Sequence, residues 1–272
     1  MHSCIHFHPS CRPLLKVALN TIYSESESGG KRRRQPPVNT YKMSSSRKLV
    51  ELFYDVVSPY SWLGFEVLCR YRTIWNLDLK LRPAFLGGVM NASGNRPPAV
   101  IPNKAVYMIT DLNRLAQYFH IPLHQPGNPF EVMFEKGSLP AMRFLTAVAE
   151  KDASGGDAVV EKVSRELWNR IWSTDQDITQ PASFSEAGLK AGLSASEVEE
   201  LINLAKSQPI KDRLKSTTQE AINYQAFGFP LIVCHVDGKP EVFFGSDRFE
   251  LLAHCIGEKW LGPQPEKPFS KM

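Results

Sequence analysis

The residues of this chain best suited to chemistry lie at the step Ser58-Pro59, within the stretch V-E-L-F-Y-D-V-V-S-P-Y-S-W-L-G-F. A mostly apolar run precedes this step, and an amphipathic pattern follows over residues 62–75. This predicts a buried strand that turns into a helix, with Ser58 at the N-cap and Pro59 at the first helical position. Backbone N–H groups converge at such a helix end, so the Ser58 hydroxyl is suited to hold an anion or a thiolate. The alternative is an ordinary cap that serves only the helix.

A second serine of this kind occurs late in the chain, in Gly245-Ser246-Asp247. An apolar segment over residues 248–256 follows and ends at a glycine, which predicts a last helix with Ser246 as its N-cap. Ser246 and Asp247 then form either a plain cap or a second positive helix end with a carboxylate beside it.

Other candidate groups are weaker. Five side chains near the start resemble metal ligands by type, namely His2, Cys4, His6, His8 and Cys11. No second cluster completes the set and the segment lacks a core, so we expect no metal site. No His/Asp pair is evident that could make Ser58 a nucleophile, and the tryptophans at helical spacing, Trp168 and Trp172, are typical of a core.

The elements that position Ser58 follow from the apolar pattern. Residues 49–57, 59–75 and 78–85 predict a strand, a helix and a parallel strand. Residues 87–98, G-G-V-M-N-A-S-G-N-R-P-P, predict a flexible loop at the ligand-binding end of the sheet. Residues 102–224 carry helical patterns, including a capping box in Ser194-Ala195-Ser196-Glu197. Residues 231–236 and 241–244 predict a hairpin around Asp237-Gly238.

Composition places the chain among soluble globular proteins. It has 272 residues, of which 43% are hydrophobic and 22% charged, and no run of about 18 apolar residues that would predict a membrane span. The net charge of +4 comes from residues 1–42, because the remainder carries 25 basic and 26 acidic residues. The body therefore shows no basic footprint for nucleic acid. Five scattered cysteines without a C-x-x-C indicate a reducing compartment.

This order of elements is that of a thioredoxin-like α/β fold interrupted by an all-helical insertion domain. We divide the chain into a disordered or transit-like leader (1–45), the first half of the thioredoxin-like domain (46–103), the helical insertion (104–225), the second half (226–262) and an extended tail (263–272). The position usually held by C-x-x-C is Ser58-Pro59-Tyr60-Ser61 here. Dithiol redox chemistry needs two thiols, so an oxidoreductase role is excluded and the binding of another molecule's sulfur is favoured.

Three segments carry a specific resemblance, F-Y-D-V-V-S-P-Y-S-W-L-G-F-E-V-L-C-R-Y, E-K-G-S-L-P-A-M-R-F-L-T-A-V and F-G-S-D-R-F-E-L-L-A-H. Over about residues 48–262 the chain resembles the kappa-class glutathione transferases, which are similar in fold to bacterial disulfide oxidoreductases and 2-hydroxychromene-2-carboxylate isomerases. The resemblance implies Ser58 as the catalytic residue. It implies glutathione contacts at Ser58, Pro59, Tyr60, Asn95, Phe229, Ser246 and Asp247, and a cis Phe229-Pro230 bond.

Phe229 departs from the family pattern, because relatives carry leucine at this position. This departure puts in doubt the packing of the pocket for the electrophilic acceptor. The resemblance further implies glutathione as co-substrate, no tightly bound cofactor, and a homodimer. The expected activity is conjugation of glutathione to small electrophiles in detoxification, with peroxidase activity as an extension. A glutathione-dependent cis–trans isomerase and a non-catalytic binding or folding-assistance module remain open as alternatives.

The last residues, Ser270-Lys271-Met272, resemble the S-K-L address that a peroxisomal import receptor recognises. Residues 1–23 contain no acidic side chain and resemble a weak transit peptide. We therefore expect a peroxisomal location, with the mitochondrial matrix as the alternative.

Overall fold

The computed structural model describes residues 46–152 and 157–266. The leader and the last three residues, with the ligand-like side chains and targeting signals expected there, lie outside the described residues. None of the described helices combines the length and the apolar composition needed to span a bilayer.

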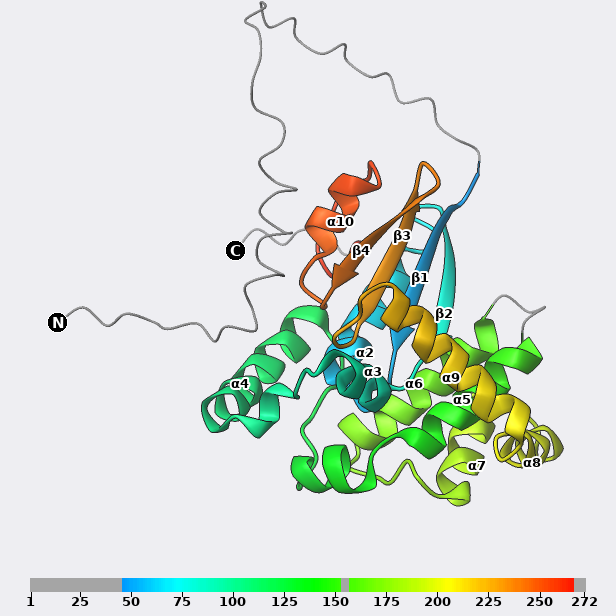
Figure 1. Cartoon of the computed structure of the whole chain (residues 1–272). Helices are drawn as coiled ribbons and strands as arrows, with labels where there is room; N and C mark the ends of the chain where they lie inside the picture. The colour runs from blue at the N-terminus through cyan, green and yellow to red at the C-terminus, as the bar shows by residue number, and fades with distance from the viewer. Residues whose placement is uncertain (1–45, 153–156, 267–272) are drawn as a thin grey trace, which may run out of the picture. The chain divides into compact units, whose positions relative to one another are not determined.

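Four strands form one mixed sheet in the order β2-β1-β3-β4 (Figure 1). They are β1 (Lys48–Tyr54), β2 (Leu77–Pro83), β3 (Leu231–Val236) and β4 (Lys239–Phe244). β1 pairs parallel to β2 and antiparallel to β3, and β3 pairs antiparallel to β4 as the predicted hairpin. α2 (Pro59–Tyr71) connects β1 to β2, so the predicted strand–helix–strand unit is present.

β1 is one of the two inner strands of the sheet, and its second half is buried on both faces. Successive side chains of a strand point to opposite faces, so Leu52 and Tyr54 join the larger apolar cluster while Phe53 joins a smaller one. The larger cluster extends through α2 into the helices of residues 102–223, and the smaller one includes Val89 and Ala221. Burial on both faces explains why this part of the sequence is an almost continuous apolar run.

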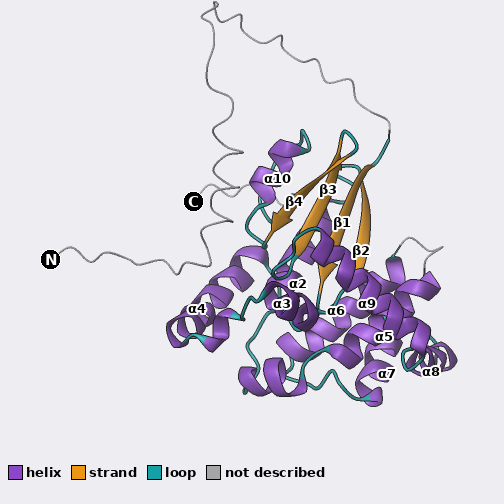
Figure 2. Ribbon diagram, viewed as in Figure 1, coloured by secondary structure: helices purple, strands orange, loops and turns teal. Residues whose placement is uncertain are grey.

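Helices gather around the end of the sheet at which β1 ends (Figure 2). They are α3 (Leu86–Ser93), α4 (Pro102–Phe119), α5 (Leu139–Asp152), α6 (Ala158–Trp172), α7 (Pro181–Lys190), α8 (Ala195–Leu204) and α9 (Gln208–Asn223), with short turns at Pro98–Val100 and Glu131–Lys136. α8 begins with the predicted capping box, since the Ser194 and Glu197 side chains each accept from the other's backbone N–H. α10 (Phe249–Cys255) follows the hairpin.

The prediction of a flexible loop over residues 87–98 was wrong for its first half, which forms α3. Glycines at the start of a segment disfavour a helix locally, but tertiary bonds fix this one. The Leu86 N–H donates to Asp55 and the Phe85 N–H to the Thr218 hydroxyl, at 2.9 and 3.0 Å, and Val89 is fully buried. Packing and remote hydrogen bonds therefore outweigh the local preference.

The helical insertion is attached to the strand–helix turn through α6. The Tyr54 hydroxyl and the Ser164 hydroxyl are 2.7 Å apart, and the Trp168 indole N–H donates to the Ser58 carbonyl at 3.2 Å. The Trp168 ring also packs against Tyr54 and Phe65, with ring centroids 5.3 and 4.8 Å apart. Trp168 is thus a core residue, as predicted, and it fixes the position of the Ser58 backbone.

We predict that Trp168→Phe lowers the free energy of unfolding by about 1–3 kcal/mol, because it removes the indole donor to a buried carbonyl. Trp172→Phe is the matched control. Trp172 is equally buried, and its indole N–H has no hydrogen-bond partner among the described residues. Urea denaturation of both variants measures the difference, and equal losses would contradict the role of the Trp168 bond.

Candidate active site

Ser58 caps α2 as the sequence predicts. Its backbone is extended, with φ −89° and ψ 115°, and its hydroxyl oxygen accepts the Ser61 N–H at 3.1 Å. Pro59 occupies the first helical position, where its missing N–H leaves no bond unmade. The first turn of α2 carries no acidic side chain, so its positive end is not compensated from within the helix.

The hydroxyl proton of Ser58 is weakly engaged. Its contact in the described chain is the Phe229 carbonyl at 3.5 Å, which is long for an O–H···O bond. The Ser58 oxygen therefore accepts one bond and keeps its proton for another acceptor. A sulfur or an anion placed at the start of α2 is such an acceptor.

Phe229 is brought to Ser58 by the loop that precedes β3. The Phe229-Pro230 bond is cis, as the resemblance implied. A Cβ atom at Gly64 would lie 3.1 Å from Pro230 Cγ, so glycine in α2 allows the close approach of this loop. Ser58 and Phe229, which are 171 residues apart in sequence, therefore form one edge of the site.

Asn95 lies beyond α3 and reaches the same loop. Its side-chain amide donates to the Phe227 carbonyl at 2.6 Å, two residues before Phe229. Tyr60, in the first turn of α2, is half-buried and donates its hydroxyl to Asp111 of α4 at 2.9 Å. Burial, and then the bond to Asp111, raise the pKa of Tyr60, so this side chain stays a neutral donor.

The prediction that Ser246 caps the last helix was wrong. α10 begins at Phe249, and its N-cap is Arg248 without a side-chain cap bond. Ser246 instead lies in the bend before this helix and is buried, whereas Asp247 is exposed and pairs with Arg248 at 3.0 Å. The Gly245 N–H donates to the Pro230 carbonyl at 3.0 Å, which places the segment next to the Phe229-Pro230 loop.

Three polar side chains that bond to the segments around Ser58 were not singled out by the sequence analysis, namely Asp55, Asp111 and Ser138. Asp55 is fully buried and accepts bonds from the Val57 N–H, the Leu86 N–H and the Ser138 hydroxyl at 3.0, 2.9 and 2.8 Å. The available signal was the single charge of the run F-Y-D-V-V-S, because a charged residue inside an apolar segment is rarely buried without a reason.

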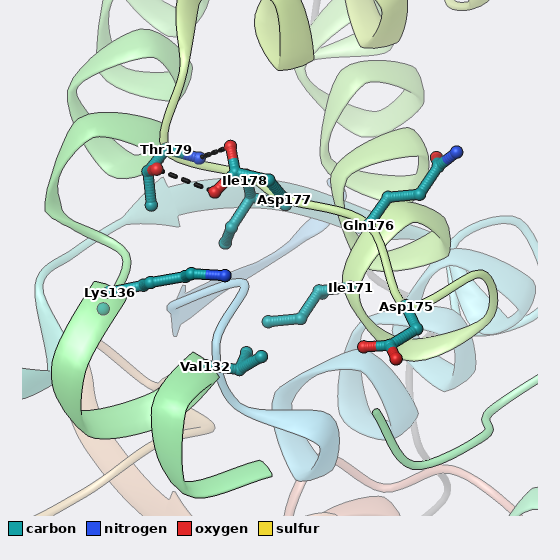
Figure 3. Close-up of a pocket in the computed structure, with 9 residues that line it drawn as sticks. Val132, Lys136, Ile171, Asp175, Gln176, Asp177, Ile178 and Thr179 are labelled. Carbon is teal, nitrogen blue, oxygen red and sulfur yellow. Dashed lines mark hydrogen bonds between the residues drawn. The ribbon is translucent and has the colours of Figure 1, made fainter. Parts of the chain in front are cut away.

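A separate pocket lies in the helical insertion between the turn of residues 131–136 and the loop before α7 (Figure 3). Several of its polar groups already have hydrogen-bond or ion-pair partners in the protein. Lys136 pairs with Glu131 at 2.8 Å, Asp175 accepts the Gly127 N–H at 2.9 Å, and Asp177 accepts the Thr179 N–H at 2.7 Å. None of the predicted site residues lines this pocket, so it is distinct from the site at Ser58.

Comparison with known proteins identifies the family. The family of DsbA-like thioredoxin domains matches residues 49–257. Glutathione S-transferase kappa 1 of Homo sapiens is 53% identical over 218 residues, which are 80% of this chain and 95% of that protein. The protein of the same name from Rattus norvegicus is 50% identical over 223 residues, 82% of this chain and 97% of that protein. The chain belongs to the kappa-class glutathione S-transferases.

The fold of this kappa-class chain is also shared by a solved 2-hydroxychromene-2-carboxylate isomerase. The two superpose with a TM-score of 0.60 at 24% identity, over 77% of this chain and 94% of that chain. A likeness at this identity concerns the fold alone. The predicted thioredoxin-like fold with a helical insertion is therefore confirmed, and so is the resemblance on which the site residues were chosen.

The start of α2 in this kappa-class chain carries the hydroxyls of Ser58 and Ser61 and no cysteine. Cys69, Cys234 and Cys255, the cysteines of the described residues, are free thiols, and none is at the start of α2. Burial raises the pKa of Cys69 well above its usual value and that of Cys234 to about 12. A thiol with a raised pKa is a poor nucleophile at neutral pH, so neither Cys69 nor Cys234 is suited to supply a reacting sulfur.

Proposed function

We propose that Ser58 binds and activates glutathione, and that the thiolate is conjugated to small electrophiles. The observation that carries this proposal is the Ser58 hydroxyl, which accepts the Ser61 N–H and has only a long contact for its own proton. A glutathione sulfur at the start of α2 would receive that proton as a hydrogen bond. The membership of the chain in the kappa class supports glutathione as the co-substrate.

The chemistry follows from the pKa of the thiol. A free thiol has a pKa near ~8.5, so little thiolate is present at neutral pH. A donated hydrogen bond and the positive end of α2 favour the charged form, and each unit of pKa is worth about 1.4 kcal/mol. The thiolate then attacks an electrophilic carbon, a C–S bond forms, and the leaving group departs with its electron pair. The thiol proton passes to solvent, and Ser58 remains a donor throughout.

A hydroperoxide is a second acceptor for the same thiolate. Attack on the O–O bond gives an alcohol and a glutathione sulfenic acid, and a second glutathione converts the latter to glutathione disulfide and water. No additional protein group is needed for this sequence. We propose it as a side activity of the same site.

The remaining contacts are proposed for the cysteinyl and γ-glutamyl parts of glutathione. The backbone of Phe229 pairs with the cysteinyl part, beside Ser58 and Pro59. Ser246 and the exposed carboxylate of Asp247 bind the γ-glutamyl end, Asp247 through the amine. Tyr60 and Asn95 complete the site. The bond from Gly245 to Pro230 supports this grouping, because it places the γ-glutamyl contacts beside the loop that faces Ser58.

We predict that glutathione bound to the wild-type protein titrates with a thiol pKa about one to two units below that of free glutathione. Ser58→Ala should return the pKa toward the free value and abolish most conjugation to a model aryl halide. Thiolate absorbance measured against pH gives the pKa, and chromatography of the product detects the thioether.

Ser194→Ala is the matched control, because Ser194 also caps a helix through its hydroxyl. Both substitutions should cost about 1 kcal/mol of stability as lost caps, but only Ser58→Ala should change the thiol. If the wild-type protein binds glutathione without lowering the pKa of its thiol, Ser58 serves only as a helix cap. Turnover without a thioether would favour the isomerase.

We also propose that the chain forms a homodimer. Three large apolar side chains on α4, Val106, Tyr107 and Ile109, are 67%, 62% and 49% exposed. A row of exposed apolar groups on one helix is typical of a surface that a partner covers. Because the chain belongs to the kappa class, we propose a second copy of the same chain as this partner.

We predict that light scattering after gel filtration gives the mass of two chains, and that Ile109→Arg shifts this mass toward one chain. A charge in a buried apolar interface is unpaired and disfavours association. Leu251→Arg, on an exposed position of α10, is the control and should leave the mass unchanged. A wild-type protein with the mass of one chain would contradict the proposal.

Finally, we propose that the protein resides in the peroxisome, through Ser270-Lys271-Met272, with the mitochondrial matrix as the alternative. The preceding segment is attached to α2, because the Tyr71 hydroxyl donates to the Gly262 carbonyl and Arg70 to the Pro263 carbonyl, both at 2.7 Å. A peroxisomal import receptor reads such an address at a free carboxyl end.

We predict that the chain with a fluorescent protein fused to its N-terminus localises to peroxisomes. Removing residues 270–272 from this fusion should leave it in the cytosol. A fusion at the C-terminus tests the leader instead, because it covers the tail and leaves residues 1–45 free. Mitochondrial signal from that second fusion, with no peroxisomal signal from the first, would favour the matrix.

A further inference from the structure

Asp55 is the buried carboxylate closest in sequence to Ser58, and the proposed chemistry does not use it. Its side chain is fully buried, and it has no ion-pair partner among the described residues. A buried carboxylate without a counter-ion is costly unless hydrogen bonds satisfy both oxygens. The position of such a group beside a proposed thiolate site requires an explanation.

The two oxygens of Asp55 join three separate segments. Oδ1 accepts the Val57 N–H of the β1–α2 turn at 3.0 Å. Oδ2 accepts the Leu86 N–H at the start of α3 at 2.9 Å, and the hydroxyl of Ser138, just before α5, at 2.8 Å. The Asp55 carbonyl in turn accepts the Ser58 N–H at 3.0 Å. One residue therefore holds the turn, α3 and α5 together.

These bonds fix the backbone that carries the site residues. The Val56 N–H points to the Met142 sulfur of α5 at 3.5 Å, and the next two N–H groups, those of Val57 and Ser58, are bound by Asp55. The same carboxylate fixes the start of α3, and α3 leads to Asn95. The side-chain amide of Asn95 donates to the Phe227 carbonyl, in the loop before Phe229. Both edges of the site thus depend on Asp55.

We propose that Asp55 is a positioning residue of the glutathione site, whose ionised carboxylate holds the β1–α2 turn in register with α3 and α5. The proposal rests on the role proposed above for Ser58. Asp55 does not touch glutathione, because it is fully buried. It acts by keeping the Ser58 hydroxyl and the start of α2 where the sulfur binds.

The charge of Asp55 makes the site sensitive to pH. Burial raises the pKa of this carboxyl to about 6, and the three hydrogen bonds oppose the rise in part. The groups that face it, two amide N–H donors and the Ser138 hydroxyl, do not titrate between pH 5 and pH 8. Below pH 6 a proton on one oxygen makes that oxygen a poorer acceptor, so the bond to at least one of the three segments is weakened.

As the pH falls, the contribution of Asp55 to the free energy of unfolding changes in the opposite direction to the expected ligand affinity. A loss of positioning can therefore be told apart from unfolding. A carboxyl whose pKa is raised in the folded state binds its proton more tightly there than in the unfolded chain, where the pKa is ~3.9. Its contribution therefore favours the folded state more as the pH falls through 6. A loss of ligand affinity over this range is not explained by Asp55 destabilising the fold.

The probe is glutathione sulfonate, a sulfur anion that stays ionised between pH 5.5 and pH 7.5 and so removes the thiol's own titration. Calorimetry should show that the wild-type full-length chain binds it about threefold more weakly at pH 5.5 than at pH 7.5. A carboxyl with a pKa of about 6 is roughly three-quarters protonated at pH 5.5, and the protonated form should bind about tenfold more weakly, the size expected for one lost hydrogen bond. Asp55→Asn should bind about tenfold more weakly at pH 7.5 and show no further loss at pH 5.5, because its amide nitrogen must face a donor.

Asp177→Asn is the matched control. Asp177 also accepts two backbone N–H groups and a serine hydroxyl, from Thr179, Gln180 and Ser183, but it lies in the loop before α7. It should leave the affinity and its pH dependence unchanged. If Asp55→Asn does not fold, Ser138→Ala keeps the charge and both amide bonds, and should weaken binding about threefold at pH 7.5.

The outcomes distinguish this proposal from the one on which it rests. If Ser58→Ala binds the sulfonate as tightly as the wild-type protein does, the anion site at Ser58 is wrong. If Ser58→Ala weakens binding but Asp55→Asn matches the wild-type protein at both pH values, only the role of Asp55 is wrong. A wild-type affinity that is flat from pH 7.5 to pH 5.5 also overturns it, as does an equal effect of Asp177→Asn.

Discussion

The structure depends on the need to satisfy the buried backbone at the turn from Asp55 to Ser58. Buried N–H and C=O groups must find partners, and a turn has no ladder of its own to supply them. Here Asp55 binds two of the N–H groups, and the Trp168 indole of α6 binds the Ser58 carbonyl. The helical insertion is therefore more than an addition to the thioredoxin frame, because it completes the hydrogen bonding of the turn that carries Ser58.

With that backbone fixed, the chemistry is decided by which atoms stand at the start of α2. Two thiols at this place could exchange electrons through a disulfide, whereas Ser58 and Ser61 can only donate and accept hydrogen bonds. The Ser58 oxygen already accepts the Ser61 N–H, so the positive helix end and one hydroxyl proton remain for a ligand. The same frame is thus suited to binding another molecule's sulfur and not to forming a disulfide of its own.

Features encoded by neighbouring residues could be predicted from the sequence. The cap at Ser58, the capping box at Ser194 and the hairpin at Asp237-Gly238 each depend on residues within a few positions, and each is present. α3, the bend at Ser246 and the partners of Asp55 could not be predicted, because they depend on contacts between distant segments. The predicted site residues Ser58, Phe229 and Asn95 are brought together by the fold, but they were chosen by resemblance and not by periodicity.

The energies indicate why a carboxylate is retained at Asp55. A pKa raised from 3.8 to about 6 means that the ionised group costs roughly 3 kcal/mol at neutral pH. The cap at Ser58 contributes only about 1 kcal/mol, so the turn does not recover this cost locally. A domain stable by about 5–15 kcal/mol tolerates such a loss. An apolar residue would remove the charge but leave three buried donors unbound, at about 1–3 kcal/mol each, so it would not restore the lost stability. The carboxylate is therefore best understood as the group that satisfies these donors and orders three segments around Ser58.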